Sequence, residues 1–370
     1  MRIAYVALGI EPKNMAGGVG RKVRGQIGLW NDMGQTARLF ALVPESQDRD
    51  LYTYRSTSST PGLREISRAI SRSDSLAHLI EAVCGFEPNI IYLRTGTYIY
   101  PVQRLFSIAP TILELNSNDL AERASRGLAA YVPHVLTRGI VLSRVAGLIA
   151  VTGEIGRLPA NQRYHKPVCV IGNGINLQQY APLPAPKHST PVITLVGSPG
   201  KRWHGVDKLV QLAAVCPDLH INIVGYESRD LNRPLPRNVS MYGFLDATGV
   251  QEILRETDVA CSSLALHRNQ MQEGSTLKVP EALAYGIPIL LAYTDASLTG
   301  LKSDCILELS NAEDNVLAHA EDIRRFAYSM LGRRLGREDV APYIDQRVKE
   351  QERLAFFQRF VRKDINASRD

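Results

Sequence analysis

The chain of 370 residues is 45% hydrophobic and 22% charged, proportions typical of a soluble globular protein that is long enough for two domains. Its net charge of +6 is spread along the sequence without interleaved aromatic residues, which disfavours nucleic acid as a partner. Five scattered cysteines without a CxxC pair argue against a disulfide framework or a zinc site, and no apolar run reaches the length of a membrane span. We therefore expect a cytoplasmic protein whose amino terminus, MRIAYVALGI, is a first strand and not a signal peptide.

Strand and helix patterns alternate through the first half of the chain. Strand-like apolar segments cover residues 2–9, 36–43, 88–94, 109–116, 147–152 and 167–174. Segments with apolar residues at helical spacing lie between them, at residues 20–34, 63–83 and 119–146. This alternation predicts a largely parallel sheet covered by helices.

A second series of the same kind follows a segment rich in Pro and polar residues, NLQQYAPLPAPKHSTP. We predict an N-terminal Rossmann-like domain over residues 1–178, a linker over 179–190, a C-terminal Rossmann-like domain over 191–338, and a helical tail over 339–370 that crosses back to the first domain. The expected fold class is α/β, with two doubly wound domains that face each other across a cleft. In such sheets, ligands bind outside the carboxyl ends of the strands.

The loop after the first strand, EPKNMAGGVGRKV, is rich in glycine. Gly17, Gly18 and Gly20 precede a helix, so backbone N–H groups there can approach an anion or a substrate closely. The GxGxxG pattern of a dinucleotide-binding turn is not met. A glycine-rich loop without a ligand is the alternative.

The segment EGSTLKVPEALAYGIPILLAY places Glu273 and Glu281 seven intervening residues apart. We expect Ser275 or Thr276 to cap a helix whose first turns contain Pro280. Free N–H groups at the start of a helix attract phosphate, and a lysine there (Lys278) adds positive charge. The alternative, that Glu281 only stabilises the helix end, leaves the first glutamate unexplained.

The Glu–x7–Glu spacing followed by ALAYGIPIL resembles the signature of retaining glycosyltransferases with the GT-B architecture, glycosyltransferase family four. The segments GGVG, VIGNGINLQQY, LVGSPGKRWHGVDKLVQLA, INIVGY and VSMYGFL occur in the order of that family's motifs. The segments IIYLR and TILELN resemble the corresponding segments of family members that build bacterial surface polysaccharides. The resemblance covers nearly the whole chain. It implies retaining transfer of a sugar from a nucleotide diphosphate sugar to a saccharide or polyprenyl-linked acceptor in surface polysaccharide or lipopolysaccharide biosynthesis, without a cofactor or a metal.

The resemblance also implies roles for individual residues. Catalytic roles fall to Glu273, Lys278 and Asn116. The donor would be bound by Glu281 at its ribose and by Gly274, Ser275, Thr276, Ser198, Lys201, Arg202 and His204. The acceptor would be bound by Gly17, Gly18, Val19, Arg94 and Glu114. For Arg94 and Glu114, a buried ion pair between neighbouring strand ends is the alternative.

The sequence departs from the family pattern at several positions. Ser198, His204 and Asn116 stand where the family often has Arg, Lys and His, and Asn176 stands where Asp is usual. These changes support a second hypothesis, a degenerate member that binds a nucleotide or sugar without transferring it. A nucleotide-sugar epimerase of the same two-domain shape is a third, which the Glu–x7–Glu spacing disfavours.

The segment over residues 119–146 mixes arginines with apolar residues. It suggests peripheral contact with the inner face of a membrane, while one or two ordinary core-facing helices are the alternative.

Overall fold

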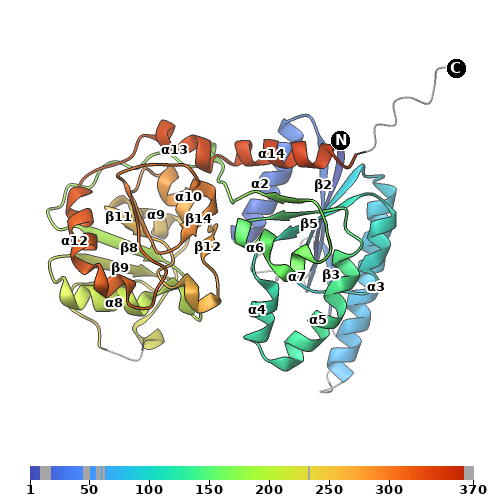
Figure 1. Cartoon of the computed structure of the whole chain (residues 1–370), viewed down its shortest axis with the longest axis horizontal. Helices are drawn as coiled ribbons and strands as arrows, with labels where there is room; N and C mark the ends of the chain where they lie inside the picture. Colours follow the sequence, from blue (N-terminus) through green and yellow to red (C-terminus); the bar gives the residue numbers. More distant parts are fainter. Residues whose placement is uncertain (9–17, 45–50, 56–59, 61–62, 232–233, 362–370) are drawn as a thin grey trace. The chain divides into compact units, whose positions relative to one another are not determined.

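The computed structural model describes residues 1–8, 18–44, 51–55, 60, 63–231 and 234–361 (Figure 1). The chain forms two compact units. The first comprises residues 1–171 together with those from Lys349 onward, and the second comprises Gly172–Val348.

The first unit is built on a seven-stranded parallel sheet with the order β3-β2-β1-β4-β5-β6-β7. Its strands are β1 (Arg2–Leu8), β2 (Thr36–Pro44), β3 (Tyr52–Tyr54), β4 (Ile90–Thr95), β5 (Thr111–Leu115), β6 (Gly147–Ala150) and β7 (Val168–Val170). The helices are α2 (Gly18–Asp32), α3 (Leu63–Gly85), η1 (Val102–Ser107), α4 (Asp119–Ala124), α5 (Leu128–Leu142), α6 (Gly153–Arg157) and α7 (Pro159–Gln162). The central strands are buried on both faces, as parallel strands between helical layers require.

The second unit repeats this plan with a six-stranded parallel sheet in the order β10-β9-β8-β11-β13-β15. Its strands are β8 (Val192–Val196), β9 (His220–Val224), β10 (Val239–Met241), β11 (Val259–Cys261), β13 (Ile289–Leu291) and β15 (Ile306–Glu308). A separate two-stranded pair joins β12 (Glu273–Gly274) and β14 (Thr294–Asp295).

The longer helices of the second unit are α8 (Val206–Val215), α9 (Ala247–Arg255), α10 (Lys278–Ala284), α12 (Ala320–Ser329) and α13 (Arg337–Ile344). Shorter helical turns are η2 (Leu177–Gln179), η3 (Arg202–His204), η4 (Ser228–Asp230), η5 (Leu266–Asn269), η6 (Ala296–Leu298) and α11 (Asn315–Ala318). The two sheets confirm the predicted α/β class with two Rossmann-like domains.

The boundary between the units lies before the Pro-rich segment that we predicted as a linker. Residues 172–178, which we assigned to the first domain, belong to the second unit, because Asn173 hydrogen-bonds to Ser275 and Ile175 to Ile344. The Pro-rich segment is held to the same unit by a hydrogen bond from Leu183 N–H to the Tyr285 carbonyl.

The last helix, α14 (Gln346–Gln358), starts in the second unit and ends in the first. Leu354, Phe356 and Phe357 of this helix pack into the first unit's core with Trp30 and Tyr92. The tail therefore completes the first unit's hydrophobic core.

The periodic segment at residues 119–146 forms two helices, α4 and α5. Gly127 separates them with a φ of 97°, a left-handed conformation that side chains other than glycine's rarely allow.

Candidate functional site

Two groups of polar residues lie at the carboxyl ends of strands, one in each unit. In the second unit, β12 leads into α10, which places Glu281 in the first turn of that helix, with Pro280 beside it. Glu273 and Glu281 are both partly buried. The Glu–x7–Glu spacing therefore joins a short strand to the start of a helix, as the sequence indicated.

Ser275 and Thr276 do not cap α10, contrary to our expectation. The N-cap residue is Leu277, which makes no side-chain capping bond. Ser275 Oγ instead accepts a hydrogen bond from Asn173 N–H at 2.7 Å and lies 2.9 Å from Ser297 Oγ. The Ser275 side chain thus binds the NGIN segment to this turn.

Thr276 is drawn into a separate hydroxyl cluster. Its Oγ1 lies 3.3 Å from Tyr293 Oη and 3.4 Å from Ser262 Oγ. The tyrosine hydroxyl also donates to Asp295 Oδ2 at 3.2 Å. The hydroxyls of Ser275 and Thr276 are thus engaged by other residues of the unit, and neither side chain caps α10.

Lys278 and His204 form the most strongly perturbed pair of this group. Lys278 Nζ lies 3.0 Å from His204 Nε2, and His204 Nδ1 lies 2.8 Å from Tyr226 Oη. Burial lowers the pKa of Lys278 to about 8. Burial, followed by the nearby charges of Lys278 and Lys201, lowers the pKa of His204 to about 3. The histidine is therefore neutral at pH 7, accepts from the ammonium through Nε2 and donates to the tyrosine through Nδ1.

Ser198, Lys201 and Arg202 follow β8, and all three are exposed. Lys201 and Arg202 line a pocket of about 570 Å³. Lys201 Nζ lies 4.9 Å from the centre of the Trp203 ring. The loop thus presents two cations to solvent next to the Lys278–His204 pair.

Arg268 fixes this loop, a role that the sequence did not indicate. Its guanidinium binds both carboxylate oxygens of Asp207 at 2.8 and 2.9 Å, and Nε binds Glu313 at 2.9 Å. It also donates to the Arg202 carbonyl at 3.2 Å. Arg268 lies 61 residues from Asp207 and 45 from Glu313 in the sequence, so no local pattern connects them.

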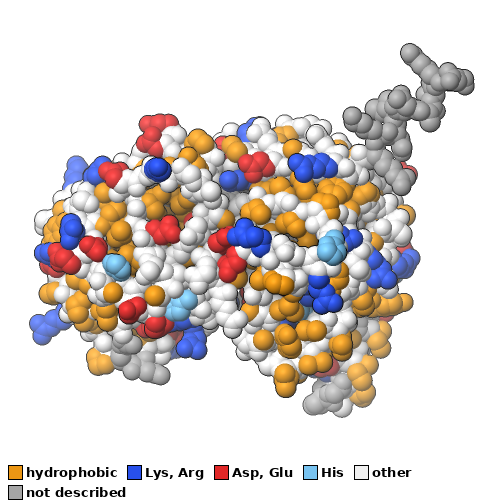
Figure 2. Space-filling model, viewed as in Figure 1, with side chains coloured by type: hydrophobic (Ala, Val, Ile, Leu, Met, Phe, Trp, Pro, Cys, Tyr) orange, Lys and Arg blue, Asp and Glu red, His pale blue; other side chains and the backbone are white. Residues whose placement is uncertain are grey.

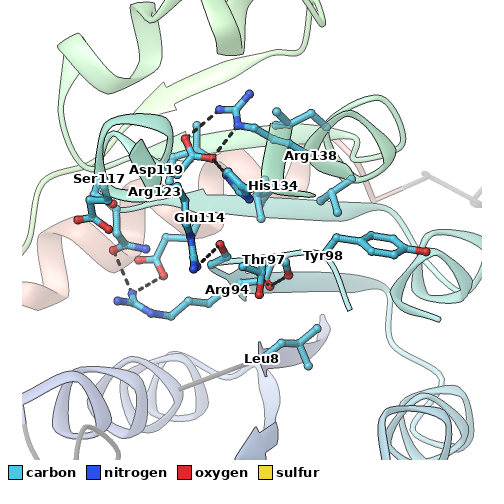
Figure 3. A pocket seen from close by; sticks show the side chains of 18 of the residues that line it. Leu8, Arg94, Thr97, Tyr98, Glu114, Ser117, Asp119, Arg123, His134 and Arg138 are labelled. Carbon is cyan, nitrogen blue, oxygen red and sulfur yellow. Dashed lines mark hydrogen bonds and ion pairs between the residues drawn. The ribbon is translucent and has the colours of Figure 1, made fainter. Parts of the chain in front are cut away.

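The first unit holds a pocket of about 260 Å³ at the carboxyl ends of β1, β4 and β5 (Figure 3). Four residues that we assigned from sequence line it: Val19, Arg94, Glu114 and Asn116. Gly17 lies outside the described residues. Gly18 is the first residue of α2.

Glu114 is the centre of a buried ion cluster in this pocket. One carboxylate oxygen accepts from Lys22 Nζ and the other from Arg94, both at 2.8 Å. Arg94 also donates to Asn116 Oδ1 at 3.0 Å. Burial alone would raise the pKa of Glu114, but Lys22 and Arg94 hold it well below its usual range. The carboxylate therefore stays ionised and aims Arg94 at Asn116.

The cluster continues through the core to α14. Tyr5 Oη lies 3.4 Å from both Glu114 and Gln26, and Gln26 donates to Glu350 at 3.0 Å. Glu350 also accepts from Trp30 Nε1 at 2.8 Å. The C-terminal helix thus belongs to the same hydrogen-bonded network as the pocket. The sequence could not indicate this, because the partners are more than 300 residues apart.

A second ion cluster lines the pocket from α4 and α5. Asp119 accepts from His134 Nε2 at 2.7 Å and from Arg138 Nε at 2.6 Å, and the two side chains converge on it in Figure 3. Arg123 reaches the Gly96 carbonyl at 2.9 Å. We had treated these residues only as parts of a helical segment. The i, i+4 spacing of His134 and Arg138 was the available signal.

These arrangements suit the binding of hydroxyl groups and anions. Among the residues that the structure describes, no three or more His, Cys, Asp or Glu side chains are grouped so that they could hold a metal ion. Within the same ranges, no helix combines the length and apolar character that crossing a bilayer requires.

The comparisons with known proteins concern the fold and the second unit. Residues 190–332 match the family model described as glycosyl transferases group 1. Among solved structures, the sucrose-phosphate synthase of Thermosynechococcus elongatus has a TM-score of 0.67 at 15% identity, covering 97% of this chain and 98% of that one. The lipopolysaccharide outer core galactosyltransferase WaaB has a TM-score of 0.64 at 13% identity, covering 97% and 100%. Anabaena HepE in complex with UDP-glucose has a TM-score of 0.62 at 13% identity, covering 97% and 100%.

The search of curated proteins gave no match. At these identities, the structural neighbours establish the fold, and the family match places Glu273, Lys278 and Glu281 inside the matched domain. The chain thus has the GT-B fold, and residues 190–332 of its second unit match the group 1 glycosyltransferase model; together these findings support a glycosyltransferase.

Proposed function

We propose that the protein is a retaining glycosyltransferase of the family-four type. It would bind a nucleotide diphosphate sugar through the second unit and a saccharide or polyprenyl-linked acceptor through the first. The observation that carries this proposal is the Lys278–His204 contact, which lies beside the Glu–x7–Glu segment within the matched domain. A buried ammonium whose pKa is lowered to about 8 is a site that gains from a bound anion.

In the proposed reaction, the bond between the sugar's anomeric carbon and the diphosphate breaks as the acceptor oxygen approaches from the same face. The leaving diphosphate takes the acceptor's hydroxyl proton, so no protein carboxylate is needed as a base. Lys278 would stabilise the negative charge that develops on the leaving oxygen, with Lys201 and Arg202 contributing from the neighbouring loop. Glu281 would bind the ribose and Glu273 the sugar hydroxyls.

UDP-glucose is the first donor to test. Anabaena HepE and an alpha-glucosyltransferase, both similar in fold to this chain, were solved with UDP-glucose bound. We also propose that the protein acts in the cytoplasm, in the assembly of surface polysaccharide or lipopolysaccharide. The fold similarity to WaaB supports this role.

The test is thermal stabilisation by UDP, GDP, ADP, dTDP and CMP. A ligand at about one hundred times its dissociation constant adds about 2.7 kcal/mol to the free energy of unfolding. We expect one diphosphate to stabilise the wild type and to lose this effect in Glu281→Ala and Lys278→Ala. Glu252→Ala and Lys302→Ala, at exposed positions of the same unit, serve as matched controls. No stabilisation by any nucleotide would contradict the donor site.

The retaining outcome has its own test. The anomeric proton signals of the sugar released by slow donor hydrolysis identify the first anomer formed. We expect the α-anomer first from UDP-α-glucose, and the β-anomer first would contradict retention. Nucleotide binding without any turnover would instead support the second hypothesis, a binding protein that does not transfer sugar. That hypothesis is motivated by three departures from the family pattern, at Ser198, His204 and Asn116.

A further inference from the structure

Helix α5 has two faces with different surroundings. His134, Arg138, Val141 and Leu142 line the pocket of the first unit. The helix also exposes four large aliphatic residues away from the pocket: Leu128 (78%), Val132 (47%), Val135 (44%) and Leu136 (75%). Their spacing of three and four residues puts them on one side of the helix. The only Asp, Glu, Lys or Arg side chain on α5 is that of Arg138, which is buried in its ion pair with Asp119.

The first turns of α3 show the same feature. Leu63, Ile66 and Ile70 are 57–59% exposed and also lie on one side of their helix. In Figure 1, these turns and the start of α5 extend toward the same end of the first unit, the lower end in that view. Figure 2 shows hydrophobic side chains over that end. Exposed apolar surface on this scale is typical of an interaction site.

The charges beside the apolar residues are mainly positive, with Glu65 as the acidic residue in the first turn of α3. Arg126 and Arg144 are exposed at the two ends of α5, and Arg64 and Arg68 are exposed along α3. A second copy docked through this surface in a two-fold dimer would bring two mainly positive surfaces together. An anionic lipid surface fits both the exposed aliphatic residues and the arginines. It accepts aliphatic side chains, and it attracts each arginine by about 1 kcal/mol.

We propose that this surface, formed by α5 and the first turns of α3, docks on a membrane that contains anionic lipid. The same α5 then presents the pocket residues His134 and Arg138 to the head group of an acceptor that stays anchored in that membrane. The second part rests on the proposed function, whereas the docking itself does not. Among the acceptors considered above, the surface selects the lipid-linked one.

The test is co-sedimentation of the full chain with vesicles, either of phosphatidylcholine alone or with phosphatidylglycerol added. We expect binding to the anionic vesicles that falls when salt rises from about 50 to about 500 mM, because salt screens the arginines. The double variant Leu128→Glu, Leu136→Glu should reduce binding at least about tenfold, since charged side chains resist entry into the apolar layer. The milder Leu128→Ser, Leu136→Ser should bind at an intermediate level.

The control variant is Val215→Glu, Leu317→Glu, which changes two exposed aliphatic residues (56% and 46%) of the second unit. It should bind vesicles like the wild type. Unchanged melting temperatures in all variants verify folding. Absence of binding to anionic vesicles, or equal binding by Leu128→Glu, Leu136→Glu, would overturn the proposal. So would a wild-type dimer that this variant dissociates, because a second copy would then cover the surface.

The two proposals fail separately. If nucleotides stabilise the protein and vesicles do not bind, only the docking surface is refuted. If vesicles bind and no nucleotide stabilises, the docking surface stands and the donor site is refuted.

Discussion

The contact between Lys278 and His204 predicts that donor binding weakens steeply above pH 8. Burial lowers the pKa of the lysine from its ordinary value of 10.5 to about 8, while the Cys261 thiol opposes this shift. The ammonium lies 3.0 Å from an imidazole that stays neutral and accepts its hydrogen bond. A bound diphosphate would supply the negative charge that the site lacks.

The magnitude follows from the lowered pKa. A change from 10.5 to about 8 disfavours the ammonium by about 3 kcal/mol, at about 1.36 kcal/mol per pH unit. Between these two values the unfolded chain binds a proton that the folded chain has lost, so the free energy of unfolding rises with pH across this window. A diphosphate that restores the ordinary pKa must take up that proton on binding. The dissociation constant should then rise about 30-fold from pH 7 to about pH 9.5.

The assay is isothermal titration calorimetry with the stabilising nucleotide at both pH values, in buffers of different ionisation enthalpy. We expect proton uptake near one per nucleotide at about pH 9.5 and near zero at pH 7. Lys278→Met should bind the nucleotide weakly at both pH values, without the pH dependence of the wild type. Lys302→Met, at an exposed position of the same unit, should behave like the wild type. A wild-type change below about threefold, or an equal slope in Lys278→Met, would refute the reasoning.

Two further predictions concern stability, measured by urea unfolding. Glu114→Gln leaves the buried cations around it without a counter-charge and should lower the free energy of unfolding by about 3–5 kcal/mol. Glu321→Gln, in an exposed ion pair, should change it by less than about 0.5 kcal/mol, and equal effects would contradict the ion cluster. Gly225→Ala should be strongly destabilising, because φ is +89° and an added Cβ would lie 2.2 Å from the Gly197 carbonyl oxygen. Gly200 has a φ of +76° but open space around it, so Gly200→Ala should lower the free energy of unfolding by only about 1 kcal/mol. A similar decrease in both variants would contradict the predicted clash and show that the residues after β9 can move aside.

Local sequence was sufficient for the elements and for the start of α10. Apolar runs of five to nine residues alternate with helical periodicity, and such runs can bury both faces only in a sheet covered by helices. Pro280 was predicted in the first turns of this helix because proline lacks the N–H that these turns leave unpaired, and it is the third residue of α10. The capping prediction for Ser275 and Thr276 was wrong because hydroxyls of distant residues compete for these side chains.

Long-range contacts were beyond the sequence. A buried ion pair between Arg94 and Glu114 at neighbouring strand ends was the alternative that the sequence left open. The structure contains this pair, but Lys22 joins it from α2 and Glu350 extends the network from α14. The Asp119 cluster with His134 and Arg138 forms only because α5 turns back at Gly127 against α4.

The sequence by itself therefore determined the two Rossmann-like units and the strand ends at which ligands would bind, since periodicity and turn chemistry act over a few residues. Only the tertiary structure decided which charges meet there. Burial then sets their protonation, because a charge that leaves water must find a partner or shift its pKa. Glu114 finds partners in Lys22 and Arg94 and stays charged. Lys278 lies beside a neutral His204, and its pKa is lowered instead.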